Sequence, residues 1–145
     1  MATVFDVARY ILEQRGTMSA MKLQKLVYYA QAWSLVWDDR QLFGSRIEAW
    51  AHGPVVRTLY DAHKGQFTVS AADFPAGDVT QLTADEQETI DAVLDGYGNR
   101  SAQWLSDQTH AEAPWRQART GLGDAERSDT EITLASMAEY YASIQ

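Results

Sequence analysis

The sequence predicts a mainly α-helical protein with one domain over residues 1–145, in which five to seven helices pack around a central apolar helix at about 20–38. Several capped segments repeat apolar residues at helical spacing. The segment at 20–38 is apolar on nearly every side, which is typical of a buried helix. A small β element is expected near 41–50, where the spacing changes and turn residues intervene. The length of 145 residues and the 46% hydrophobic content suit one globular domain.

Two helices are predicted at the start of the chain. The first follows the N-cap Thr3 and ends at Gly16. Its apolar stripe comprises Val4, Val7, Ala8, Ile11 and Leu12. The second follows the cap Ser19 and continues from Ala20 to about Asp38. Its apolar face comprises Leu23, Leu26, Val27, Ala30, Trp33 and Trp37.

A change of period marks the next segment. Leu42-Phe43 and the stretch 47–50 are predicted as two short extended pieces around a turn at Gly44-Ser45. Pro54 is predicted as the first residue of a third helix that ends at Gly65, because proline suits the first helical position. Residues 66–82 show no clear period, and we expect a loop with room for one weak strand.

The remaining helices are predicted from their caps. Thr83 and Glu86 form a capping box for a helix that Gly96 and Gly98 end. Further helices are expected after Ser101, to about residue 110, and from Pro114. Residues 121–129 are predicted as a polar linker, and a final amphipathic helix is expected at about 133–144.

Charge is unevenly distributed along the chain. The formal net charge is −8. Residues 1–72 carry eight Lys and Arg against six Asp and Glu, whereas residues 73–145 carry four against fourteen. An acidic half repels a phosphate backbone and attracts basic partners, so it predicts either solubility alone or a surface for a basic protein.

Several classes of protein are disfavoured. The absence of cysteine excludes disulfides and thiolate metal sites. No signal peptide is visible, and the most apolar stretch is too short to cross a bilayer, so we expect a cytoplasmic protein without membrane association. The first two helices superficially resemble a helix-turn-helix, but residues 26–30 offer a DNA groove chiefly apolar side chains. Nucleic acid is therefore disfavoured as a partner, and a DNA-binding autoregulator is a lesser alternative.

No catalytic residue, metal ligand or cofactor site is predicted. The chain lacks a nucleophile elbow, a phosphate-binding loop and a zinc-binding histidine motif. A hydrolase-like arrangement of His52, His110 and a carboxylate is the alternative. We favour the interpretation that the ring of His52 binds backbone groups and fixes its turn.

The aromatic residues divide into two groups. Core positions are expected for Trp33, Trp37, Trp104 and Tyr141, which lie on helical stripes. Partial exposure is expected for Trp50, Tyr60 and Trp115, which flank turns. The predicted partner-binding residues are His52, Arg57, Tyr60, Lys64 and Trp115. The alternative is that the turn at 52–54 only caps the third helix and holds Trp50 against the second.

Three segments in order resemble the SocA-like, or Panacea, domain family over about residues 4–119. The first segment contributes Lys22, Leu23, Gln24, Leu26, Tyr28, Tyr29, Ala30, Gln31 and Trp33. The second contributes Trp50, Gly53, Pro54 and Val55, and the third contributes Thr109, His110 and Pro114. This domain also occurs in phage-associated proteins of the GepA type.

The resemblance implies an antitoxin rather than an enzyme. Such a domain neutralises a cognate protein toxin by binding it, and the toxin is usually encoded in an adjacent gene. A basic toxin would complement the acidic half of this chain. The alternatives are a proteolytic adaptor that presents its client to a Clp-type protease, and a phage-associated regulator that binds a host protein.

Overall fold

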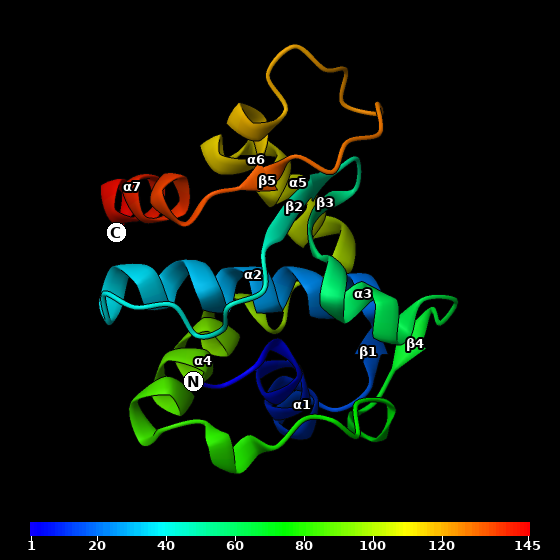
Figure 1. The fold of residues 1–145 in the computed structure, drawn as a ribbon, viewed down its shortest axis with the longest axis vertical. Coiled ribbons are helices and arrows are strands. Elements are labelled where there is room, and N and C mark those ends of the chain that lie inside the picture. The colour runs from blue at the N-terminus through cyan, green and yellow to red at the C-terminus, as the bar shows by residue number, and fades with distance from the viewer.

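The helix α2 (Ala20–Trp37) lies at the centre of the computed structural model, which describes residues 1–145. It contacts α1, α4, α5, α7 and the strand β3. Figure 1 shows α1 and α4 on one side of α2, with α7 and a small sheet on the other. Residues 23–34 of this helix are all buried, which explains why it is apolar on nearly every side. The predicted mainly α fold around this helix is confirmed.

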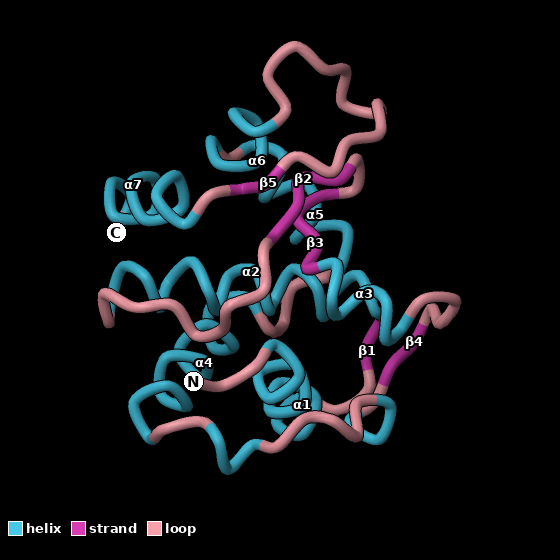
Figure 2. Tube along the Cα trace, in the orientation of Figure 1, coloured by secondary structure: helices cyan, strands magenta, loops and turns pink.

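Seven helices and five short strands make up the chain (Figure 2). Besides α2, the helices are α1 (Val4–Arg15), α3 (Arg57–His63), α4 (Ala84–Tyr97), α5 (Ala102–Ala111), α6 (Ala113–Ala118) and α7 (Leu134–Ile144). The strands are β1 (Met18–Ser19), β2 (Ile47–Trp50), β3 (Gly53–Val56), β4 (Thr68–Val69) and β5 (Glu131–Ile132). Two 3-10 turns, η1 (Ala71–Asp73) and η2 (Val79–Gln81), precede α4.

The small sheet has the order β3-β2-β5, and all of its pairs are antiparallel. Ile47 lies opposite Val56 on one side and opposite Ile132 on the other. The strands β1 and β4 form a separate two-stranded pair. The β4 pairing confirms the weak strand expected within residues 66–82.

The structure corrects two predictions about the segment after α2. Pro54 does not begin a helix: it lies in β3 opposite Ala49, and α3 begins at Arg57. Leu42 and Phe43 are not extended in a ladder, because Gln31 holds their backbone instead. The strand β5 arises within a stretch for which no strand was predicted. Its alternating pattern is only two residues long, too short for sequence periodicity to detect.

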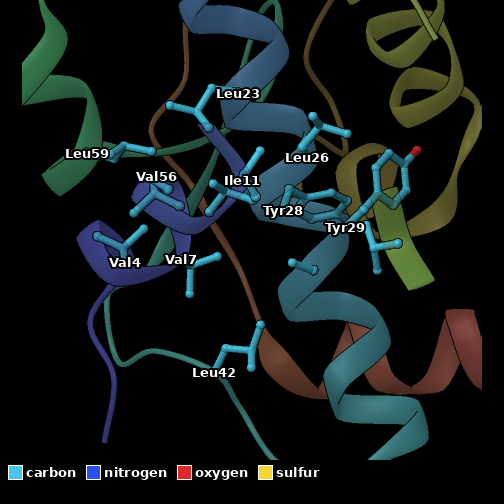
Figure 3. Close-up of a cluster of buried hydrophobic side chains, with 14 of the residues drawn as sticks. Val4, Val7, Ile11, Leu23, Leu26, Tyr28, Tyr29, Leu42, Val56 and Leu59 are labelled. Atoms are coloured by element: carbon cyan, nitrogen blue, oxygen red, sulfur yellow. The ribbon is translucent and has the colours of Figure 1, made fainter. Parts of the chain in front are cut away.

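The buried core joins α1, α2, β3 and α3 (Figure 3). Val4, Val7 and Ile11 of α1 lie toward the central helix, as the stripe on α1 predicted. The caps also form as expected. Thr3 and Asp6 make a capping box for α1, and Thr83 and Glu86 make one for α4.

Two buried glutamines on α2 bind the backbone of neighbouring segments. Gln24 accepts a hydrogen bond from the Val56 N–H at 2.9 Å and donates one to the Val56 carbonyl at 3.3 Å. Since β3 is an edge strand, this side chain takes the place of a further strand. Gln31 binds the loop in the same way, with Oε1 2.7 Å from the Leu42 nitrogen and Nε2 2.9 Å from the Phe43 oxygen.

We expect Gln24→Leu to lower the free energy of unfolding by about 1–3 kcal/mol, because it leaves the buried Val56 backbone groups without partners. Urea denaturation measures this change. Gln14→Leu, at an exposed position of α1, is the control. An unchanged midpoint for Gln24→Leu would show that the amide does not stabilise β3.

Candidate functional site

A cavity of about 980 Å³ lies between the β2–β3 hairpin, α3 and the loop between α6 and β5 (residues 119–130); we call it the hairpin hollow. In Figure 1 this loop rises above the sheet. The hairpin contributes Trp50, Ala51 and His52. The helix α3 contributes Arg57 and Tyr60, and Lys64 follows its last residue. The loop contributes Asp124, Ala125, Arg127, Ser128 and Asp129.

Four of the five predicted partner-binding residues therefore line one cavity. Arg57 and Tyr60 are three residues apart, the spacing that places them on one face of α3, and Lys64 follows directly after the helix. Tyr60 packs its ring edge-on against Trp50, with 4.8 Å between the ring centroids. His52, Arg57 and Lys64 are exposed, whereas Tyr60 and Trp50 are half-buried. The expected partial exposure of Trp50 and Tyr60 is confirmed.

The fifth residue, Trp115, is buried, so the expectation that it is partly exposed was wrong. Its side chain is 2% exposed, and its indole N–H donates to the carbonyl of Trp50 at 2.8 Å. It is therefore a support behind the hairpin, with no surface to offer a partner. Trp37 departs from expectation in the opposite direction, because 45% of it is exposed at the end of α2.

The turn between β2 and β3 is fixed by α5, and not by its own histidine. The ring of His52 makes no hydrogen bond within the chain, which corrects the interpretation favoured from the sequence. Instead, Nε2 of His110 lies 3.0 Å from the carbonyl oxygen of Ala51. The hydroxyl of Ser106 donates to the carbonyl of His52 at 3.0 Å. Because Nδ1 of His110 contacts the Ser106 carbonyl, both of its ring nitrogens face backbone oxygens.

The loop wall is held by two arginines. Arg119 is buried and donates to the carbonyls of Ala49, Gly123 and Glu126, while its guanidinium lies 4.9 Å from the ring of Trp115. Arg46 donates to the carbonyl of Asp129 at 3.0 Å. Sequence reasoning missed this wall, because residues 121–129 looked like a polar linker. A buried arginine that binds loop carbonyls leaves no periodic signal.

Lys25 lies buried beneath the turn. It is 1% exposed, its Nζ has no hydrogen-bond partner, and burial lowers its pKa to about 7. Gly53 has a φ of +117°, and a Cβ there would stand 2.7 Å from Cε of Lys25. The glycine therefore permits both the backbone conformation and the close approach of the lysine.

A buried hydrogen-bond network includes Tyr28 and Tyr29 of α2. Glu112 is buried and accepts hydrogen bonds from the hydroxyls of Tyr29, at 2.8 Å, and Tyr141, at 2.7 Å. Tyr28 contacts Tyr141 at 3.0 Å. Burial raises the pKa of all three tyrosines. This network ties α2 to α7 and to the junction of α5 and α6.

The geometry gives little support to the hydrolase-like alternative. Both nitrogens of His110 contact carbonyl oxygens, so the ring has no free lone pair aimed at a substrate. No group of three His, Asp or Glu side chains is placed to hold a metal ion.

None of the helices has the length and apolar character needed to span a membrane.

Comparison with known proteins identifies the domain. A family model described as "Antitoxin SocA-like, Panacea domain" matches residues 23–116, which include most of α2, the hairpin, α3, α4, α5 and the start of α6. No curated protein and no solved structure matches the chain. The hairpin and α3 walls of the hollow lie inside the matched segment, and the loop wall lies outside it. Because the match spans more than half of the sequence, the chain belongs to the SocA-like Panacea family of antitoxin domains.

Proposed function

We propose that this chain is the antitoxin of a toxin–antitoxin system, and that it neutralises a protein toxin by binding it directly through a surface that includes the hairpin hollow. The observation that supports this most is the hollow itself. It brings exposed cationic side chains and half-buried aromatic rings together on a rigid hairpin and helix. Aromatic and arginine side chains are the usual anchors of protein interfaces.

The alternatives differ in what else they require. An adaptor also needs a surface for its client, so the hollow suits that role too, but it requires a Clp-type protease as a second partner. A regulator requires a host protein in place of the toxin. A DNA-binding autoregulator requires a basic face, and the net charge of −8 opposes it.

Co-expression with each flanking reading frame tests the proposal. We expect one neighbour to halt growth when expressed alone, and this chain to restore growth and co-purify with that product. Trp37→Ala, at an exposed site on the far end of α2, serves as a surface control that should still rescue. The proposal would be contradicted if no flanking product is toxic, or if a toxic product is neither neutralised nor bound by this chain.

Association with the toxin should slow as salt rises. The exposed face of α4 carries Asp85, Glu88 and Asp95, in the segment 65–99 that holds seven acids and no base. Such a face attracts a basic partner from a distance, and salt weakens this attraction by screening the charges. We expect stopped-flow association rates to fall by about tenfold between about 0.05 and 0.5 M salt. Rates that do not change with salt would exclude steering.

A further inference from the structure

We infer that the hairpin hollow receives an acidic, aromatic-containing segment of the partner polypeptide. This inference rests on the proposed function and adds the chemistry of the bound segment. It also separates two surfaces of the chain: the acidic face of α4 would attract a basic partner from a distance, whereas the hollow would bind an acidic stretch within that partner.

The cationic side chains of the hollow are not neutralised within the chain. The ion pairs of the structure join Arg9 with Glu13, Arg15 with Asp95 and Arg46 with Glu48. Arg57, Lys64 and Arg127 are all exposed and take part in none of them. The two carboxylates of the lining, Asp124 and Asp129, are outnumbered by these three bases. A chain with a net charge of −8 thus carries a local excess of positive charge.

Aromatic rings stand beside these cations. Trp50 donates its indole N–H to Glu48 at 2.8 Å, which fixes the orientation of the ring. Tyr60 packs edge-on against it and also against His63, with 5.3 Å between those ring centroids. Both rings are half-buried, so each presents a flat apolar surface in a fixed orientation. A segment that combines carboxylates with one large apolar side chain fits this lining.

The lining favours a polypeptide over a nucleic acid. Asp124 and Asp129 would repel phosphate groups, whereas a polypeptide can place amides or a basic side chain opposite them. The acidic half of the chain would also oppose the approach of a long polyanion. A volume of about 980 Å³ accommodates several residues of an extended segment.

The hollow is formed before any partner arrives. His110 and Ser106 hold the hairpin turn, and Arg119 and Arg46 hold the loop wall through backbone carbonyls. A site that is already ordered loses little conformational entropy on binding. The three cations therefore line a cavity whose hairpin and loop walls are held in place.

Fluorescence anisotropy with labelled peptides tests the inference without knowledge of the toxin. One probe is a short peptide of glutamates around a single tryptophan, and its partner has lysines in place of the glutamates. We expect the purified chain to bind the acidic probe in the hollow, whereas any binding of the basic probe to the acidic face of α4 should not change when charges in the hollow are reversed. Arg57→Glu and Arg127→Glu should each weaken binding about tenfold or more. Arg40→Glu and Arg116→Glu, at exposed sites outside the hollow, should change it less than about twofold.

The outcomes separate this inference from the proposed function. Failure of the acidic probe to bind, equal weakening of both probes by the charge reversals, equal loss in the control variants, or tighter binding of a labelled single-stranded oligouridine would overturn the acidic-segment assignment. Circular dichroism of each variant establishes that the fold is intact. A further outcome is that the chain neutralises a toxic neighbour while the variants with reversed charges in the hollow bind that toxin as tightly as the wild type. In that case the antitoxin role stands and the inference about the hollow fails.

Discussion

Trp33→Ala is expected to lower the free energy of unfolding by about 3–5 kcal/mol, because it removes a large buried side chain from the central helix α2. Trp33 is 8% exposed and donates its indole N–H to the hydroxyl of Tyr97 at 3.1 Å. Its ring also lies 5.4 Å from that of Tyr141, so it joins α2 to both α4 and α7. The substitution would leave a cavity where three helices meet. Chemical denaturation monitored by circular dichroism measures the change.

The neighbouring tryptophan provides the matched control. Trp37 stacks on Trp33 one turn later, with 5.0 Å between the ring centroids, but it is 45% exposed. We expect Trp37→Ala to cost no more than about 1 kcal/mol. A cost below about 1 kcal/mol for Trp33→Ala itself would show that α2 is not the centre of the core.

The second large effect concerns Lys25 and pH. Its pKa is about 7 in the folded chain and about 10.4 in an unfolded one, because burial disfavours the ammonium. Between these values the unfolded chain holds a proton that the folded chain lacks, so stability should rise with pH. We expect a rise on the order of 2 kcal/mol between pH 7 and 9, measured by urea denaturation at each pH.

Lys25→Met should abolish that rise and stabilise the protein near pH 7. Methionine fills a similar volume without a charge to bury. Lys64→Met, at an exposed position, controls for the loss of a lysine. A wild-type profile that is flat from pH 7 to 9, or a variant that keeps the rise, would contradict the burial of an unpaired amine beneath the turn.

Other groups limit the pH range of this effect. Burial lowers the pKa of His63, so the unfolded chain gains a proton first as the pH falls below about 6.5, and stability falls further. Burial raises the pKa of Tyr28, Tyr29 and Tyr141. Above about pH 10 the unfolded chain loses those protons first, which lowers stability. Maximum stability is therefore expected near pH 9–10.

Helices were predictable from sequence wherever a cap and an apolar stripe coincide. The caps Thr3, Ser19, Thr83 and Ser101 all form, and α2 is central, as its nearly continuous apolar surface predicted. The prediction for Pro54 was wrong because proline suits an edge strand as well as the first position of a helix. The pairing of β3 with β2 decides between the two. This hairpin is local, but each of its strands is only four residues long, which is too short for sequence periodicity to distinguish a strand from a helix start.

The candidate site was predictable only where it is local. His52, Arg57, Tyr60 and Lys64 lie within one short segment, so their proximity followed from the sequence. The loop that contributes Arg127 joins them across about half of the chain, through contacts of Arg119 and Arg46 with backbone carbonyls. Trp115 was misjudged for the same reason, since its role depends on a carbonyl of the distant hairpin.

Titration of the purified toxin with this purified chain tests the central claim most directly. If binding alone neutralises the toxin, toxin activity should fall linearly and reach zero at a fixed stoichiometric ratio, with no protease, nucleotide or other component present. Full toxin activity at saturating concentrations of the chain would contradict direct neutralisation and favour an adaptor. Complete loss at a small fraction of the toxin concentration would instead reveal catalysis.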